Sequence, residues 1–406
     1  MATLPILVLN SGSSSIKFSV YEAEGEHRNK LLEGAVDGIG ANGGQNLGKF
    51  WIKSCTSKAN GERLVDETPA VPDLDAAFAL VANALKNPPF PRPLAIGHRM
   101  VCGGPTVTEN QQITPELIDE MERYTAFAPL HTPVAIYIMR QVLREFPGVP
   151  NFVCLDSYFH RNLPQVARQL PIPETYTAMG VRRFGAHGLS YESIVAHLQP
   201  NVPARLIVAH LGNGASISAI FEGQGVDTSM GLTPTGGLIS GSRTGDIDPG
   251  VLLFILRKLA DTATNTADAA NQLEKIVNKQ SGLLGVSQLT NDMRALRQAI
   301  AEGNKDARLA VDEFTYSIRK FIGSYVAALG GLDMLVFTGG IGENDAATRS
   351  EVCSGLESLG ILLDPALNNA RGETRISASG SPVSVLVIPP AEDLMIVNHV
   401  CRMLGD

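Results

Sequence analysis

Several features are scarce in this sequence, and each scarcity excludes a class of protein. The 406 residues include only five cysteines, which form no Cys-x-x-Cys pair: Cys55, Cys102, Cys154, Cys353 and Cys401. Because they are odd in number and widely spaced, we expect neither a disulfide framework nor a zinc site, and we expect a cytoplasmic protein. No apolar run reaches the ~18 residues of a membrane-spanning helix. The first residues do not resemble a signal peptide.

Positive charge is also in short supply. Lysine and arginine number 33 against 41 acidic residues, which gives a formal net charge of −8. This balance disfavours a nonspecific nucleic-acid binder, whose phosphate contacts require an excess of basic residues. Hydrophobic residues make up 44% and charged residues 18%, as in globular proteins. At ~100–200 residues per domain, the length predicts two or three domains.

The common nucleotide-binding motifs are missing as well. The chain has no Gly-x-x-x-x-Gly-Lys-Ser/Thr, and "HRM" at His98 is not a His-Arg-Asp. No Asp-Phe-Gly occurs, and "GGIGEN", residues 339–344, lacks the Gly-x-Gly-x-x-Gly spacing. P-loop enzymes, protein kinases and dinucleotide-binding domains are therefore disfavoured. A glycine loop after a strand can still let a purine or ribose pack against the backbone.

The chain does contain strands that alternate with helices, which indicates an α/β fold. Apolar residues recur at helical spacing over 135–146, and a buried strand, residues 152–155, then ends at Asp156. A longer amphipathic helix is expected over about 307–329. It is followed by the strand "LDMLVF" and the loop "TGGIGEN".

The most informative pattern is an internal echo. "ILVLNSGSSSIKFSVYEAEG" near the start is similar to "LIVAHLGNGASISAIFEGQG", residues 206–225, if a single-residue slip is allowed. Each stretch has an apolar strand, a tip of small residues with glycine and an alternating second strand. Two unrelated hairpins would look similar by chance in some cases. The alternative is a duplicated fold with one phosphate-holding hairpin in each half.

The small tip residues have a physical use. A Gly/Ser turn lets backbone N–H groups approach an anion closely, because no bulky side chains intervene. Ser15 and Lys17 would add a hydroxyl donor and a positive charge to the first hairpin. One such turn is weak support for a phosphate site, since most merely reverse the chain.

Ten polar motifs lie in order along the chain, and together they resemble the acetate kinase (acetokinase) family over nearly the whole length. They are "LNSGSSSIKFSV", "GHRMVCGG", "APLHTP", "CLDSYFH", "RRFGAHGLS", "AHLGNGAS", "TPTGGLISGSRTGDIDP", "TNDMR", "FTGGIGEN" and "PPAEDLMI".

This resemblance implies a duplicated, two-domain fold of the actin, Hsp70 and sugar-kinase (ribonuclease H-like) type with an interdomain active-site cleft. We expect one domain over 1–156, with the C-terminal helix 393–406 packed back on it. The second, 157–392, would carry most of the nucleotide site. The implied reaction is reversible, direct in-line phosphoryl transfer from ATP to acetate, which yields ADP and acetyl phosphate and belongs to acetyl-CoA biosynthesis. Mg²⁺, with Mn²⁺ as a substitute, would assist, and the enzyme would be a homodimer without nucleic-acid or membrane partners.

The resemblance also implies roles for individual residues. The family's catalytic positions match Asp156, His187, Arg243 and His131. Its substrate-binding positions match Arg99, Val101, Leu130 and Pro234. Its magnesium-site positions match Asn10 and Glu392. Beyond the first hairpin, its nucleotide-binding segments match His210, Leu211, Gly212, Asn213, Gly214, Asp292, Met293, Arg294, Gly340, Ile341, Gly342, Glu343 and Asn344.

These residue types suit the chemistry. A carboxylate is already a nucleophile, but its charge must be offset before it can approach an anionic phosphoryl group. Arginine stays charged and offers a planar fork to carboxylate or phosphate oxygens. Each residue also has a plainer interpretation. Arg99 or Arg243 could form an ordinary ion pair, Asp156 could orient an arginine instead of a metal, and Glu392 could favour a helix N-terminus.

The chain departs from the family pattern at three positions. Cys102 and Tyr191 stand where the family usually has histidines, and Ala186 stands where a phenylalanine usually walls the acyl pocket. A wider pocket predicts weaker selectivity for acetate over propionate, unless Tyr191 refills the space. A propionate or broader short-chain acyl kinase is therefore the first alternative. A sugar-type kinase, which would need a base and a polar pocket, and a non-catalytic nucleotide-switched protein are less favoured by the paired arginines.

Overall fold

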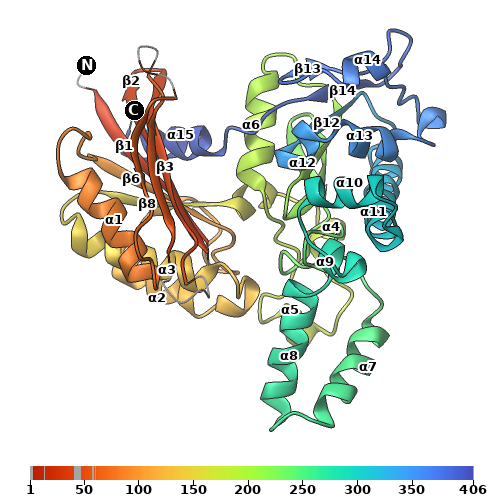
Figure 1. Cartoon of the computed structure of the whole chain (residues 1–406), viewed down its shortest axis with the longest axis horizontal. Helices are drawn as coiled ribbons and strands as arrows, with labels where there is room; N and C mark the ends of the chain where they lie inside the picture. Colours follow the sequence, from red (N-terminus) through yellow and green to blue (C-terminus); the bar gives the residue numbers. More distant parts are fainter. Residues whose placement is uncertain (1–2, 13, 41–46, 57–58, 60, 406) are drawn as a thin grey trace. The chain divides into compact units, whose positions relative to one another are not determined.

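The computed structural model describes residues 3–12, 14–40, 47–56, 59 and 61–405. Ser13, in the first predicted hairpin tip, lies outside them. The chain divides into two compact units, which we describe separately. Unit 1 comprises Met1–Tyr158 and Ala391–Asp406, and unit 2 comprises Phe159–Pro390 (Figure 1).

Unit 1 is built on an eight-stranded sheet with the order β5-β4-β3-β2-β1-β6-β8-β7. Strands β1 to β5 are antiparallel neighbours, whereas β1, β6 and β8 run parallel. The strands are β1 (Leu4–Ser11), β2 (Ser15–Glu24), β3 (His27–Asp37), β4 (Lys49–Ser54), β5 (Arg63–Glu67), β6 (Ala95–Met100), β7 (Gln111–Gln112) and β8 (Asn151–Leu155).

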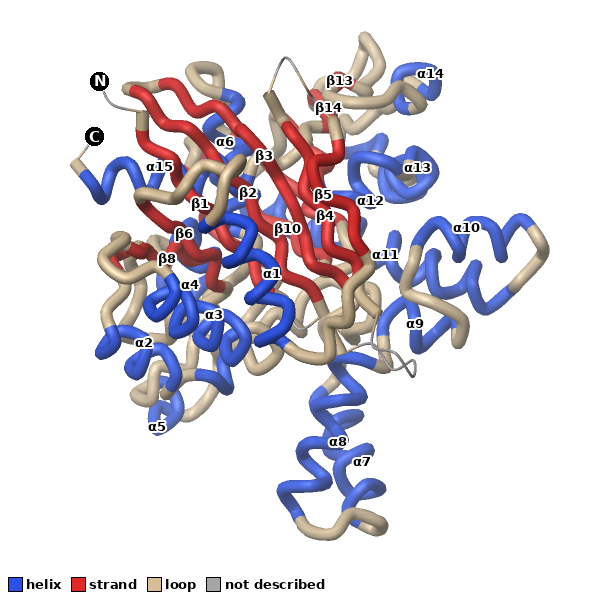
Figure 2. Tube along the Cα trace, turned by 60° about the vertical axis from the view of Figure 1, so that its left-hand side comes forward, coloured by secondary structure: helices blue, strands red, loops and turns tan. Residues whose placement is uncertain are grey.

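Helices cover both faces of this sheet. On one face, α1 and α3 bury apolar residues against Leu7 and Leu9 of β1, and Figure 2 shows these helices beside the twisted strands. The C-terminal helix α15 contacts the central strands β1, β2, β6 and β8. The helices of unit 1 are α1 (Leu74–Lys86), α2 (Pro115–Glu122), α3 (Thr132–Glu145) and α15 (Glu392–Leu404).

Unit 2 repeats the same topology. Its six-stranded sheet has the order β11-β10-β9-β12-β14-β13, with β9 and β10 antiparallel and β9, β12 and β14 parallel. The order β3-β2-β1-β6-β8 in unit 1 therefore corresponds strand by strand to β11-β10-β9-β12-β14. The strands are β9 (Arg205–Leu211), β10 (Ala215–Phe221), β11 (Gln224–Thr228), β12 (Met334–Thr338), β13 (Thr374–Arg375) and β14 (Ser384–Val387). The expected duplicated α/β fold is confirmed.

The hairpin echo and its slip are visible in the strand register. Asn10 lies opposite Lys17 in the first hairpin, whereas His210 lies opposite Ser216 in the second. The second connection is thus one residue shorter, which accounts for the single-residue slip in the sequence comparison. The two hairpins are equivalent in place, although their tips differ in length.

The sheet of unit 2 is buried on both faces, so its strands are apolar at successive positions rather than alternating. Ile207 and Ala209 face the core beneath α11, while Leu206 and Val208 face α6. The helix expected over 307–329 is confirmed as α11, whose residues Phe314 and Ile318 are fully buried. Within unit 2, α7 and α8 form a helical hairpin that projects from the rest of the unit (Figures 1 and 2).

The helices of unit 2 range from 4 to 25 residues in length. They are α4 (Gln165–Arg168), α5 (Glu174–Thr177), α6 (Gly188–Leu198), α7 (Pro249–Ala260), α8 (Thr266–Lys279), α9 (Gly282–Ser287), α10 (Met293–Ala301), α11 (Lys305–Leu329), α12 (Gly339–Asn344), α13 (Ala346–Cys353) and α14 (Pro365–Asn368). No helix in the described ranges is long and apolar enough to cross a membrane.

Close packing between α15 and β6 predicts a stability effect. A Cβ atom on Gly97 would lie 2.4 Å from Cγ2 of Ile396, so Gly97→Ala should overpack this contact and destabilise unit 1 by about 1–3 kcal/mol. Gly323→Ala, in α11 with no atom within 4 Å, is the matched control and should be neutral or stabilising. Urea unfolding followed by circular dichroism measures both variants, and fluorescence of Trp51, the sole tryptophan, follows unit 1. Equal stability of the two variants would contradict this packing.

Candidate functional site

In unit 1, polar residues gather at the carboxyl ends of the parallel strands. Asn10 lies near the end of β1, Arg99 near the end of β6, and Asp156 directly follows β8. In open α/β sheets, ligands bind outside this edge. The sheet order therefore brings together residues that are up to 146 positions apart in the sequence.

Arg99 and Asp156 form the strongest charged contact at this edge. Nε and Nη2 of Arg99 both donate to Asp156, with an Nη2–Oδ2 distance of 2.8 Å, and the Asp156 side chain is fully buried. On the other side of the guanidinium, Nη1 lies 3.4 Å from Oε2 of Glu392, the first residue of α15. Burial by itself would lower the pKa of Arg99, but the two carboxylates raise it above its ordinary value. Arg99 is therefore a permanent cation with 18% of its side chain exposed.

The same residues offer oxygen ligands to a hard divalent cation. Burial raises the pKa of Glu392; Arg99 opposes this rise, and Asp156 adds to it. Two carboxylates thus share one guanidinium and carry an excess negative charge, which suits a cation that prefers oxygen and keeps several waters. The described residues contain no cluster of three or more His, Cys, Asp or Glu side chains able to hold a metal by themselves. The set fits Mg²⁺ held partly by water and substrate, rather than in a protein cage.

Other predicted residues of unit 1 lie around this edge. Lys17 is exposed on β2 opposite Asn10, and its charge acts on Glu392. Val101 follows β6 directly, and its carbonyl accepts a hydrogen bond from Ser157 next to Asp156. His131 and Leu130 immediately precede α3 and are partly buried. Cys102 is buried, and its sulfur accepts a hydrogen bond from the Gly104 N–H.

In unit 2, two histidines and an arginine approach the tip of the second hairpin. The rings of His187 and His210 are stacked with centroids 4.2 Å apart. A Cβ atom on Gly214 would lie 3.4 Å from Nη1 of Arg243 and 3.5 Å from Nε2 of His187. Both polar groups therefore lie close to the backbone of the turn.

Arg243 lies in a desolvated environment. Its Nη1 donates to the carbonyl of Pro234, and burial lowers its pKa. A buried guanidinium of this kind gains when an anion binds nearby, because the anion replaces the solvation that burial removed.

A pocket of about 880 Å³ opens beside this cluster in unit 2. Its lining includes eight of the residues expected to bind nucleotide: Gly212, Asn213, Asp292, Met293, Arg294, Gly340, Ile341 and Asn344. The side chain of Arg294 hydrogen-bonds Asp292 and lowers the pKa of Asp292 to about 2, so this carboxylate stays charged. Gly342 is buried and Glu343 has its pKa raised by burial, and neither lines the pocket. The segments follow β9, begin α10 and form α12, and they are far apart in sequence.

The pocket also has lining residues that the sequence did not single out: Asn291, Arg297 and Asp345. Arg297 joins two walls, because its Nε donates to Asp345 at 2.9 Å and its Nη atoms donate to both oxygens of Glu351 at 2.8 Å. In the sequence, the only indication that Arg297 lines the pocket is its position one helical turn beyond Arg294 on α10. Its partners on α13 are invisible to a linear motif.

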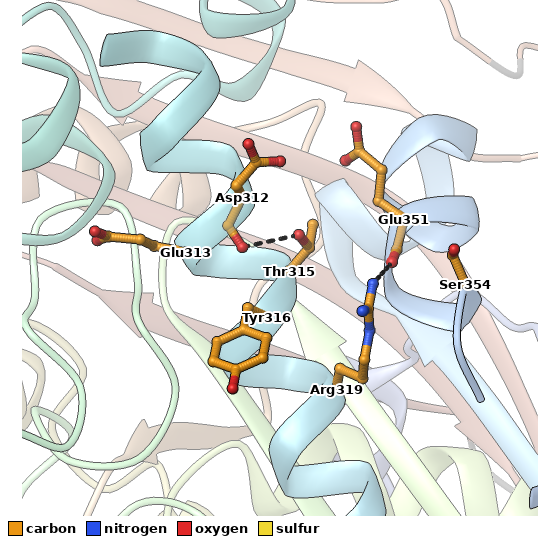
Figure 3. A pocket seen from close by; sticks show the side chains of 7 residues that line it. All are labelled: Asp312, Glu313, Thr315, Tyr316, Arg319, Glu351 and Ser354. Atoms are coloured by element: carbon orange, nitrogen blue, oxygen red, sulfur yellow. Dashed lines mark hydrogen bonds between the residues drawn. The ribbon is translucent and has the colours of Figure 1, made fainter. Parts of the chain in front are cut away.

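Glu351 is also contacted by a second arginine, from α11. Arg319 of α11 donates to the backbone carbonyl of Glu351, in a second, acidic pocket between α11 and α13 (Figure 3). Because α13 is fixed to α11 in this way, Arg297 ties the pocket wall formed by α10 to the core of the unit.

The positions where we expect departures from the family pattern do not all leave open space. Tyr191 is fully buried in α6, and its hydroxyl hydrogen-bonds Ser216. Its ring packs near His160, with the two centroids 5.6 Å apart. Ala186 is also buried, and its carbonyl is 3.2 Å from Nε2 of His160. In this arrangement the Tyr191 hydroxyl is engaged in a hydrogen bond with Ser216.

We expect Arg297→Gln to raise the dissociation constant for ATP and ADP roughly tenfold, about 1.4 kcal/mol, because the pocket wall loses its ion pairs. Arg308→Gln is the matched control, since Arg308 also binds Glu351 but does not line the pocket, and its affinity should change less than about twofold. Isothermal titration with ADP measures both. Equal losses in the two variants would show a general effect of the ion-pair network instead.

Comparison with known proteins agrees with this arrangement. The sequence profile of the acetokinase family matches residues 5–398. Acetate kinase of Phocaeicola vulgatus is 40% identical over 415 residues, covering 99% of this chain and 100% of the relative. The crystal structure of Porphyromonas gingivalis acetate kinase has a TM-score of 0.83 at 35% identity, covering 99% and 100%. That of a propionate kinase from Francisella tularensis has a TM-score of 0.87 at 34% identity, covering 98% and 100%. The chain belongs to the acetokinase family.

Proposed function

We propose that this protein transfers the γ-phosphoryl group of ATP to acetate, reversibly, and forms acetyl phosphate and ADP. Family membership supports this reaction most directly. The observation in the structure that carries it is the pair of partly buried arginines, each at the carboxyl end of a duplicated sheet. Arg99 sits between two carboxylates in unit 1, and Arg243 lies beside His187 and the Gly214 turn in unit 2.

The chemistry needs little acid–base work. The acid arrives as a carboxylate and is already nucleophilic, so the protein's task is to position two anions and offset their repulsion. Arg99 is held rigidly by Asp156 and would bind the acid, with Val101, Leu130 and Pro234 forming the apolar part of the acyl site. Asp156 then acts by orienting Arg99, as the two hydrogen bonds between them support.

The transition state spreads negative charge over the equatorial oxygens of the phosphoryl group. Arg243 and His187 would donate to those oxygens, and His131 would be a further donor. Preorganised donors of this kind stabilise the transition state more than the ground state. Because burial lowers the pKa of Arg243, its charge is better matched when the anionic phosphoryl group is present.

Asn10 and Glu392 would hold Mg²⁺, or Mn²⁺, through oxygen ligands and water. When bound, the ion offsets the charge of the nucleotide phosphates. Ser15, Lys17, His210 and the residues of the 880 Å³ pocket would hold the nucleotide. Glu343 and Gly342 shape the short helix α12 behind that pocket.

We also propose a cytoplasmic homodimer. The helix α7 has no buried residue within the described chain, although its sequence is "PGVLLFILRKLA" and Leu253 and Phe254 are 52% and 60% exposed. A second copy of the chain is the occupant that family membership favours for this apolar face. All five cysteines are thiols, as expected for a reducing compartment.

The direct test of the reaction traps the product. Purified protein with ATP, Mg²⁺, acetate and hydroxylamine should form acetohydroxamate, and omission of acetate or ATP should abolish the colour. Absence of hydroxamate with a folded, ADP-binding protein would reject acetate phosphorylation. Slow ATP hydrolysis without hydroxamate would instead favour a nucleotide-switched binding protein.

The small side chain of Ala186 predicts reduced selectivity. One methylene in an apolar pocket is worth only ~1–3 kcal/mol, so kcat/KM for propionate should come within about tenfold of that for acetate. Ala186→Phe, which restores the residue usual in the family, should lower the propionate value more than the acetate value. A propionate value a hundredfold or more below acetate in the unaltered protein would reject the wide pocket.

The two arginines should differ in their kinetic effects. Arg243→Leu should lower kcat by about 10²–10³-fold with little change in KM, because it removes a donor used in the transition state. Arg99→Leu should mainly raise the KM for acetate, and it also leaves Asp156 unpaired, so unit 1 must be checked by Trp51 fluorescence. Steady-state kinetics with near-normal constants for either variant would remove that arginine from its role.

A further inference from the structure

A chain of three side chains in unit 2 ends on His187. The hydroxyl of Tyr191, in α6, hydrogen-bonds Oγ of Ser216, in β10, and the same Oγ lies 2.8 Å from Nδ1 of His187. Both Tyr191 and Ser216 are fully buried. The contact therefore reaches His187 from the interior of the unit.

The geometry leaves these groups little freedom. The Tyr191 ring is packed against Phe159 and His160, with centroid distances of 6.0 and 5.6 Å. His187 itself is in the left-handed region, at φ 55°, and its ring is stacked on His210. The Nδ1 edge of His187 thus stays on Ser216.

The acidity of the two hydroxyl groups decides the direction of the hydrogen bonds. A phenol, with a pKa near 10, is a far stronger proton donor than the alcohol of serine. This difference favours donation from Tyr191 to Ser216 Oγ, which directs the single proton of Ser216 to Nδ1 of His187. A neutral imidazole that accepts at Nδ1 must carry its proton on Nε2.

We propose that Tyr191 and Ser216 are positioning residues that fix the Nε2–H tautomer of His187. This proposal rests on the proposed phosphoryl transfer for its purpose, but not for its geometry. Nε2 and Cε1 of His187 would each lie 3.5 Å from a Cβ atom on Gly214, in the turn that Nη1 of Arg243 also approaches, whereas Nδ1 lies on Ser216. A donor at Nε2 can bind a phosphoryl oxygen together with Arg243, whereas the other tautomer would turn a lone pair toward that anion.

Tyrosine is well suited to this role, and it is a departure of this chain from its family. A histidine at position 191 can present either a donor or an acceptor to Ser216, depending on its own tautomer. Tyrosine removes that ambiguity, because its hydroxyl stays protonated at neutral pH and is the stronger donor of the pair.

The tautomer is measured directly by NMR of the whole protein labelled with ¹⁵N-histidine, without nucleotide or acid. The His187 resonances are assigned by their loss in His187→Gln. We expect an acceptor-type Nδ1 and a protonated Nε2 in the unaltered protein. A protonated Nδ1 there would overturn the proposal without any need for a variant.

Two substitutions test the relay itself. Tyr191→Phe removes only the hydroxyl, and Ser216→Ala removes the group that contacts His187; each should lower kcat about tenfold or more and leave the KM for ATP and for acetate within about twofold. The Nδ1 signal should move toward the average of an exchanging imidazole. Ser216→Thr keeps the hydroxyl and should restore most of kcat.

The outcomes separate this proposal from the proposed function. If His187 carries its proton on Nε2 but the protein forms no acetohydroxamate, the proposed reaction is rejected and the relay is supported. Normal kcat and an unchanged His187 spectrum in both Tyr191→Phe and Ser216→Ala would overturn the relay while the reaction stands. If Ser216→Ala and Ser216→Thr show the same low kcat, the loss reflects altered packing. That result would also overturn the relay.

Discussion

The guanidinium of Arg99, held between Asp156 and Glu392, is the interaction on which unit 1 depends most. Asp156 is fully buried, and a buried carboxylate without a partner would cost several kcal/mol. The pair is satisfied only when β6 and β8 are neighbours and the first turn of α15 lies at their carboxyl ends. The last helix of the chain is thereby joined to strands that end about 240 to 290 residues earlier, and the Arg99 guanidinium is held in one position at this edge.

In unit 2, the corresponding strand ends depend on glycine backbone rather than on a pair of carboxylates. Glycines at 212, 214 and 340 leave the strand ends and the hairpin tip open for close approach, and Gly339 takes a positive φ of 77° where a Cβ would meet the backbone of Leu211. The walls of such an open pocket need support from elsewhere. Arg297 supplies it through Asp345 and Glu351, and Arg319 anchors Glu351 to α11.

The duplicated topology explains why the two units carry different chemistry on the same frame. In the first hairpin, Asn10 lies opposite the exposed cation Lys17; in the second, His210 lies opposite the buried Ser216. A one-residue difference in the connection changes which side chain faces the end of the first strand. The first hairpin is therefore suited to bringing charge to the edge of its sheet. The second is suited to orienting histidines, since Ser216 contacts His187 and Ser190 contacts His210.

Much of this was determined by the sequence alone. Apolar runs of the right length predicted β8 and α11, the echo indicated the duplicated sheets, and the absent motifs disfavoured other nucleotide-binding folds. The ordered motifs indicated which strand ends carry Asn10, Arg99, Asp156 and His210. Only the tertiary structure decided what those residues touch: that Asp156 orients Arg99, that Arg297 ties α10 to α13, and that Tyr191 is committed to Ser216. Hydrophobic periodicity is a local property, so it can be read from a single segment of the sequence. A hydrogen bond between side chains distant in sequence depends on strand order and register, which no single segment encodes.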